Sequence, residues 1–311
     1  MRKFDNALGY MIYMGLSGTL YFVALKNSFG SGVVFPIILG LGLIGFIVEC
    51  MRELISIVKV DKTIPTWSKD DIFAILSVVI ASIVTFLISR EFGISNVIAS
   101  ALVGLFGALI LPKFSGEIFC GSFVGMASHM LVGSIFYLLL AGIVAGIVFV
   151  IIGNRVFQGL GGKMGTSAFS GCVVMILLNG NRIAGAPITE PSVIVLILVY
   201  SVLSVVLIYS ISVRLKLGAV LASSIVGLIG GLILLMVYVE YGSILAAVSF
   251  CASFSGMASK ERFSNELGIS LVGLITGVIF AFSYTFMVGA GGKLGTIALA
   301  SNIAGAGIIS A

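Results

Sequence analysis

The sequence predicts an all-α protein that crosses a membrane several times, and three observations carry this prediction. Of the 311 residues, 59% are hydrophobic and only 9% are charged, which gives a mean hydropathy of +1.25. Apolar runs recur that are long enough to cross roughly 30 Å of hydrocarbon at about 1.5 Å per residue. Large parts of the sequence also occur twice. Such a composition excludes an ordinary globular protein.

Two apolar runs precede the duplicated part, and we expect them to form two accessory transmembrane helices at about 7–25 and 31–50. The first run is too long for the core of a signal peptide and lacks a persuasive cleavage site, so we expect a retained helix. A polar stretch follows at 51–71. It contains Arg52, Lys59, Lys62, Pro65 and Lys69. Its basic content predicts a cytoplasmic loop, which completes an N-terminal region spanning 1–71.

Four pairs of matching segments indicate an internal duplication. Residues 97–111 match 220–234 at 10 of 15 positions, and 119–128 match 250–259 at 8 of 10. The other two pairs are Gly142, Gly146 and Phe149 with Gly273, Gly277 and Phe280, and GGKMGT at 161–166 with GGKLGT at 291–296. The matches keep their order and nearly their spacing, which chance similarity between apolar segments does not explain. We therefore expect repeat 1 in 72–180 and repeat 2 in 192–311.

Each repeat contains five apolar elements. In the first repeat they are expected at about 72–89, 94–111, 117–128, 131–153 and 165–178. In the second they are expected at about 193–213, 218–239, 243–259, 267–289 and 295–309. The third and fifth elements are short and rich in glycine, serine and alanine. Short segments of this kind at matching positions in two halves are typical of the binding region of a transporter.

An odd number of crossings per repeat predicts that the two repeats have inverted topology. The cytoplasmic side would then receive Arg52 to Lys69, Lys113, Arg155, Arg214, Lys216, Lys260 and Arg262. The external side would receive Lys26, Arg90, His129, Arg182, Glu190 and Glu240. This asymmetry favours a cytoplasmic N-terminus in a plasma membrane, although Arg90 and Arg182 weaken it. If the third element of each repeat is re-entrant, the repeats become parallel.

The two glycine–lysine motifs are the first candidate substrate-binding site. Its residues are Gly161, Gly162, Lys163, Gly165 and Thr166, with Gly291, Gly292, Lys293, Gly295 and Thr296. Each lysine stands just before a short apolar helix, whose unpaired N–H groups and partial positive charge attract anions. The threonines could donate hydroxyl groups or cap the helix. The alternative is that both lysines extend to lipid headgroups at opposite interfaces.

The matched segments FCGSFVGMAS and FCASFSGMAS are the second candidate. Their serines, Ser122, Ser128, Ser253 and Ser259, could line an aqueous path, and Gly125 and Gly256 permit a bend. The alternative is helix packing alone, since close packing in lipid also requires small residues. The four phenylalanines, Phe119, Phe123, Phe250 and Phe254, could constrict a pore or simply contact the core.

Several function classes lose support from the sequence. No basic cluster with interleaved aromatic residues indicates nucleic-acid binding, and the four cysteines lack metal-ligand spacing, so we expect neither a metal nor another cofactor. No catalytic constellation indicates an enzyme. The expected spans lack central carboxylates, since Glu49 and Glu117 stand near boundaries, which weakens proton or sodium coupling.

The sequence therefore predicts an integral membrane transport protein, either a secondary carrier or a channel. It would move a small anionic or polar solute through a site between two inverted repeats. The architecture resembles several secondary transporters and solute channels, which transfers no substrate. The alternative is a membrane-embedded structural or assembly subunit of a larger complex. The expected partners are the lipid bilayer and the solute, and the many small residues are compatible with a homo-oligomer.

Overall fold

The computed structural model of the protein describes residues 2–59, 68–152 and 155–310, and within these residues the chain forms helices and connecting turns without strands. The N-terminal part contains α1 (Arg2–Ser28), η1 (Phe29–Ser31) and α2 (Val34–Lys59). The next part contains α3 (Lys69–Phe92), α4 (Asn96–Ile110), η2 (Pro112–Phe114), α5 (Ser115–Gly125), α6 (His129–Val132), α7 (Ile135–Ile152) and α8 (Lys163–Asn179). The last part contains α9 (Pro191–Tyr209), the π-helical turn η3 (Ser210–Arg214), α10 (Ala219–Val237), α11 (Gly242–Ser255), α12 (Glu266–Ser283) and α13 (Lys293–Ile309).

Local signals explain where the long helices begin and end. A capping box joins the side chains and backbone of Ser68 and Asp71 at the start of α3, and Gly93 ends that helix with a left-handed backbone, φ 62°. Pro191 occupies the first turn of α9, where its missing N–H costs nothing. The Asn265 side chain accepts the Gly268 N–H at the start of α12.

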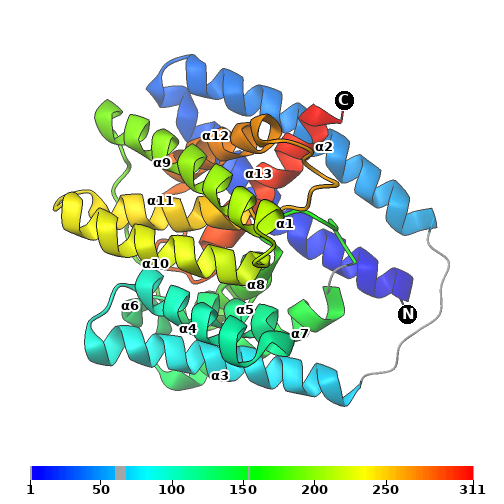
Figure 1. The fold of residues 1–311 in the computed structure, drawn as a ribbon, viewed down its shortest axis with the longest axis vertical. Coiled ribbons are helices and arrows are strands. Elements are labelled where there is room, and N and C mark those ends of the chain that lie inside the picture. Colours follow the sequence, from blue (N-terminus) through cyan, green and yellow to red (C-terminus); the bar gives the residue numbers. More distant parts are fainter. Residues whose placement is uncertain (1, 60–67, 153–154, 311) are drawn as a thin grey trace.

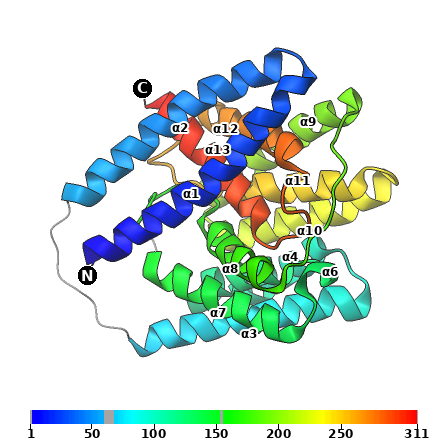
Figure 2. The same ribbon diagram turned by 180° about the vertical axis from the view of Figure 1, so that it is seen from behind.

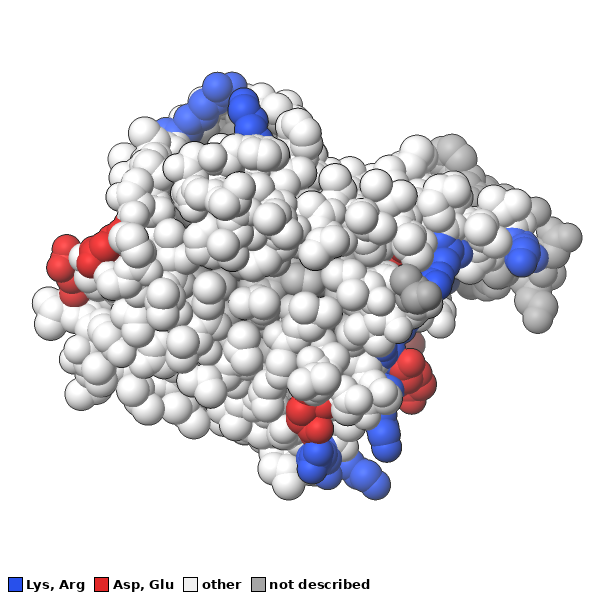
Figure 3. Space-filling model, turned by 90° about the horizontal axis from the view of Figure 1, so that it is seen from above, with Lys and Arg blue, Asp and Glu red and all other residues white. Residues whose placement is uncertain are grey.

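Within the described ranges, seven helices are long and apolar enough to cross a membrane: α1, α2, α3, α7, α9 with η3, α10 and α12. Four shorter apolar helices of 10–17 residues accompany them: α4, α8, α11 and α13. The outward surface is apolar, as the exposed side chains of Ile37, Ile80 and Met236 illustrate. Figure 3 shows one face with few charged side chains, which gather at its margins. The predicted all-helical, membrane-embedded fold is confirmed at this level.

Helices α8 and α13 lie together at the centre of the molecule (Figure 1). Helices α5 and α7 pack against α8, and α11 and α12 pack against α13. The two groups of outer helices also meet through α4 and α10. Helices α1 and α2, prominent in Figure 2, pack against α12 and α13, and α1 also contacts α7 and α8. The N-terminal helices are therefore part of the packed core.

The contact between α2 and α13 is made by glycines. A Cβ atom added to Gly307 would lie 1.8 Å from the carbonyl oxygen of Gly45, and one added to Gly45 would lie 2.3 Å from that of Ala304. Small residues permit this approach of two helix backbones, as in other closely packed membrane helices.

The two largest differences from the predicted boundaries are at the ends of α2 and α12. Helix α2 continues to Lys59, whereas we expected it to end near residue 50, because the buried carboxylates Glu49 and Glu53 are paired and stay within the helix. Helix α12 ends at Ser283, before the expected 289, because Met287 and Gly289 have left-handed backbones, with φ of 45° and 77°. The predictions for Lys62 and Pro65 fall outside the described residues.

Candidate functional site

Both glycine–lysine motifs open a helix, as predicted. Gly162 and Gly292 are the N-caps of α8 and α13, and their left-handed backbones, φ 89° and 78°, require glycine. The helices begin at Lys163 and Lys293 themselves, two positions earlier than expected. Each lysine therefore lies in the first turn of its helix, beside the unpaired N–H groups.

The first turns of the two helices pass each other in opposite directions. A Cβ atom on Gly165 would lie 2.5 Å from the Cα atom of Gly295, and the reverse distance is also 2.5 Å. On one side of this point Gly162 approaches Leu299, and on the other Gly292 approaches Phe169. The two motifs therefore pack directly against each other at the centre of the molecule.

Each motif also packs against one FCxSFxGMAS segment, namely the one that lies farther from it in sequence. Gly161 approaches the carbonyl oxygen of Phe254, and Gly291 approaches that of Phe123, so a Cβ atom would lie 2.2 and 2.4 Å away. The N–H of Ser259 donates to the Gly159 carbonyl over 2.8 Å, and the N–H of Ser128 donates to the Gly289 carbonyl over 2.9 Å. The structure therefore joins all four sequence segments at one place.

Four phenylalanines fill the space between α5 and α11. Phe119, Phe123, Phe250 and Phe254 are each at most 2% exposed. Every pair among them has ring centroids between 4.4 and 6.2 Å apart, within the range of favourable aromatic contacts. These four residues, the phenylalanine quartet, form one continuous apolar cluster.

A cavity of about 970 Å³ reaches the first motif from the molecular surface. Its lining runs from the exposed residues Gln158 and Glu261 to Phe123 and Phe254 of the quartet. Between these ends it is lined by Gly161, Gly162, Lys163, Met164 and Gly165 of the motif, together with Tyr13, Glu117, Met257, Ser259 and Arg262. The cavity therefore combines a helix N-terminus, two cations, two carboxylates and apolar walls, and it reaches the quartet.

The two motif lysines have different surroundings. Lys163 lines the cavity, whereas Lys293 is only 7% exposed. The Nζ atom of Lys293 donates to the carbonyl oxygens of Tyr284 and Phe286 over 2.8 and 2.7 Å. Backbone carbonyls are among the partners that a buried lysine finds in a membrane protein. The alternative in which Lys293 extends to lipid headgroups therefore does not describe this structure.

The connection between α8 and α9 covers the chain near Lys293. A Cβ atom on Gly185 would lie 2.5 Å from Val288 Cγ2 and 3.3 Å from Thr285 Cα. A second cavity of about 480 Å³ lies beneath residues 184–190 and reaches Tyr284 and Val288, without reaching the GGKLGT residues. At its edge, hydrogen bonds from Ser192 and Tyr241 hold the pKa of the Glu190 carboxyl below its usual range.

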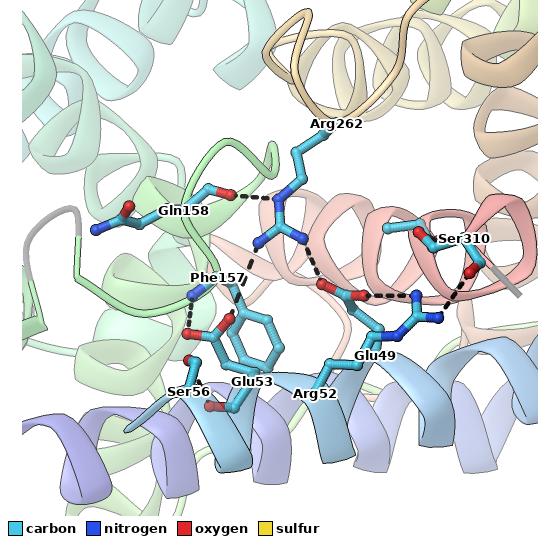
Figure 4. A network of polar contacts seen from close by, with 9 residues as sticks. Glu49, Arg52, Glu53, Ser56, Phe157, Gln158, Arg262 and Ser310 are labelled. Carbon is cyan, nitrogen blue, oxygen red and sulfur yellow. Dashed lines mark hydrogen bonds and ion pairs between the residues drawn. The ribbon is translucent and has the colours of Figure 1, made fainter. Parts of the chain in front are cut away.

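An ion-pair network borders the first cavity (Figure 4). Arg262 lies 2.6 Å from the Glu49 carboxylate and 3.9 Å from that of Glu53, and its Nε donates to the Gln158 carbonyl over 2.7 Å. The other Glu53 oxygen accepts the Phe157 N–H over 2.9 Å. Phe157 has a left-handed backbone, φ 50°, which an extensive network must hold in place. This network ties α2 to the segments on either side of the cavity.

Several predicted site residues do not face the cavity. Ser122 and Ser253 are fully buried and bond to Ser100 and Ser223, so they join neighbouring helices. Thr166 and Thr296 donate to the carbonyls of their own N-caps. Gly125 and Gly256 allow α5 to approach α3 and α11 to approach α9, and Ser128 contacts Gly289. These positions serve packing, while Ser259 is the one serine of the predicted set among the lining residues.

Sequence reasoning missed four contributors to this region: Tyr13, Glu49, Glu53 and Arg262. The Tyr13 hydroxyl lies 2.7 Å from that of Ser167 on α8, so α1 forms part of the cavity wall. The spacing of Glu49 and Glu53 was a usable signal, because residues four apart share one helix face.

No group of three His, Cys, Asp or Glu residues that could hold a metal ion exists in the described part of the chain. Comparison of the chain with protein-family models, with curated proteins and with solved structures found no match.

Proposed function

We propose that this protein is a membrane transport protein that moves a small anionic or polar solute. The observation that carries the proposal is the cavity of about 970 Å³, which leads from the surface to the GGKMGT motif and reaches the phenylalanine quartet. A polar, partly charged cavity that penetrates an apolar helical protein has a large cost in lipid unless it serves a solute pathway.

The proposed solute site lies at the start of α8. The backbone N–H groups of the first helical turn and the cations Lys163 and Arg262 supply hydrogen-bond donors and positive potential there. The glycines of the motif leave the backbone open to close approach. Because the lining also includes Glu117 and Glu261, the site as a whole is polar and only locally positive.

We further propose that the pathway lies between two inverted repeats. In support, residues at matching sequence positions make the same kinds of contact in both parts of the chain. The thiol of Cys120 donates to the Met164 carbonyl, as that of Cys251 does to the Leu294 carbonyl. The serine pair Ser100–Ser122 likewise has its counterpart in Ser223–Ser253. The opposed directions of α8 and α13 at their crossing are those that a twofold axis in the membrane plane would generate.

The one-sided opening favours a carrier over a channel. One motif is reached by the cavity, and the equivalent lysine of the other is buried under Tyr284 and Phe286. A carrier must close one side while the other is open. The two glycine–lysine motifs fit that requirement, because one lines an open cavity and the lysine of the other is buried. In this proposal, rocking of the two halves exchanges their surroundings.

The positive-inside rule favours a cavity mouth on the cytoplasmic side. The end of α2, the start of α3 and the end of α7 lie on the right in Figure 1. These ends carry Lys59, Lys69 and Arg155, the last just after α7. The proposed orientation thus puts the N-terminus in the cytoplasm and the protein in the plasma membrane.

The test is solute flux into proteoliposomes that contain the purified protein, with anions, cations and neutral polar solutes compared. Lys163→Ala, Lys293→Ala and the double variant are measured beside wild type, with Lys113→Ala, a surface lysine that is 67% exposed, as control. Selective flux that the folded Lys163→Ala variant loses supports the site. Flux that survives the double change removes the role of the lysines. Absence of flux with folded wild-type protein favours an assembly subunit instead.

A further inference from the structure

The ion-pair network contains one carboxylate, that of Glu53, with which a bound anion would compete for Arg262. Glu53 is 7% exposed and projects from α2 toward Arg262, with its carboxylate 3.9 Å from the guanidinium. Arg262 and Lys163 both line the cavity. Arg262, one of the two cations that line the cavity, therefore already faces an acidic side chain of the protein.

The acidic side chains of this region offset its cations before any solute enters. Lys163 and Arg262 carry two positive charges, and Glu49 and Glu53 carry two negative ones. Around them, Tyr10 of α1 and Cys50 of α2 are neutral, and Arg52 of α2 stands 3.9 Å from Glu49 with 43% of its side chain exposed. Glu117 and Glu261 add negative charge elsewhere on the cavity wall. Arg52 adds a third positive charge, but with Glu117 and Glu261 the region carries four negative charges, so an entering anion would add uncompensated negative charge in a poorly solvated place, which is unfavourable.

A proton taken up by one carboxylate removes this cost. Glu49 is the poorer acceptor, because it lies between two arginines, 2.6 Å from Arg262 and 3.9 Å from Arg52. Glu53 lies farther from Arg262, at 3.9 Å, and its other oxygen is held by the neutral Phe157 N–H over 2.9 Å. Protonation of Glu53 therefore gives up less favourable interaction than protonation of Glu49.

We propose that a small anion binds in the cavity at Lys163 and Arg262 together with one proton, which passes from water onto the Glu53 carboxylate. The inference rests on the proposed function only in taking this cavity as the solute site. On release of the anion the proton returns to water, and Glu53 resumes its place as counterion of the two cations. Anion affinity accordingly rises as the pH falls.

The direct test is proton uptake on binding. Purified protein in detergent and weak buffer is titrated with sodium chloride, nitrate or sulfate, whose anions do not themselves take up protons. Binding is measured by calorimetry and proton uptake with a pH indicator. For at least one of these anions we expect about one proton per anion bound. The dissociation constant should then change about tenfold per pH unit while Glu53 is ionised in the free protein.

Glu53→Gln is the decisive variant, because glutamine keeps an oxygen that can accept the Phe157 N–H. It should bind the same anion without proton uptake and without the pH dependence. The matched control is Asp70→Asn, which removes an exposed carboxylate paired with Lys113 and should retain both. Binding without proton uptake in the wild type, or uptake that persists in folded Glu53→Gln, overturns the proposal, as does failure of all three anions to bind. Proton-linked binding without flux into proteoliposomes would instead overturn the transport function and leave this site standing.

Discussion

Gly165 and Gly295 face each other where α8 and α13 cross, and neither position has room for a side chain. A Cβ atom on one would lie 2.5 Å from the Cα atom of the other. Because the obstructing atoms belong to the backbone, a neighbouring rotamer cannot relieve the overlap. The two helices that carry the motif lysines are thus held at the shortest separation their backbones allow.

Gly165→Ala or Gly295→Ala should destabilise the protein by about 1–3 kcal/mol or more, as overpacking of a close contact does. The contact is reciprocal, so the two variants should behave alike. Thermal unfolding in detergent, followed by size-exclusion chromatography, measures the effect. Gly40→Ala is the matched control, since nothing lies within 4 Å of a Cβ atom there and alanine favours the helix. Equal stability of all three variants would contradict the geometry of the crossing.

The phenylalanine quartet should keep the wild-type protein closed to ions. Replacing both Phe123 and Phe254 by alanine removes two of its rings, and we expect a steady ion conductance in planar bilayers that the wild type lacks. The same change removes buried aromatic area, so thermal stability must be measured in parallel. Phe136→Ala, at a residue that is 66% exposed, should remain non-conducting. A folded double variant without conductance would show that the barrier lies elsewhere.

We expect that residues 184–190, which cover the chain near Lys293, must move during transport. Cysteines at Gly185 and Val288 are close enough for a disulfide, which needs Cβ atoms about 3.5–4.5 Å apart. Oxidation of the Gly185→Cys, Val288→Cys double variant should abolish solute flux, and reduction should restore it. Each single variant should be insensitive to oxidant. Unchanged flux in the cross-linked protein would mean that this side need not open.

The cavity should admit a water-soluble thiol reagent. The four native cysteines are buried, so the wild-type protein should react slowly. Met257→Cys places a thiol on the cavity wall and should react quickly with a membrane-impermeant methanethiosulfonate added from the cavity side. Labelling of inside-out and right-side-out vesicles, read by mass spectrometry, also identifies that side. Equal labelling from both sides would contradict a one-sided opening.

Much of the helical order could be predicted from the sequence. Apolar length predicted the long helices, and the glycines before Lys163 and Lys293 predicted helix starts within two residues, because a left-handed cap and an apolar run are local signals. The end of α2 does not depend on a local signal. Hydropathy falls after Cys50, yet the helix continues because Arg262, distant in sequence, pairs with Glu49 and Glu53.

The site was predictable only in part, for a related reason. Nearly identical motifs gave no indication that one lysine would line a cavity and the other would be buried, because that difference depends on the packing of other segments around each copy. The serines of the FCxSFxGMAS segments were ambiguous, since a small hydroxyl suits both a water-filled path and a helix contact. Ser122 and Ser253 serve the helix contact.

The contact between Gly45 and Gly307 bears on how the chain is assembled in the membrane. Helix α2 is made early in synthesis, but the helix it packs against through these glycines, α13, is made only after both groups of outer helices. Until then, Gly45 lacks its contact with α13, and Glu49 and Glu53 lack Arg262. The contact between α2 and α13 therefore closes only after every helix that lies between them in the chain has been made.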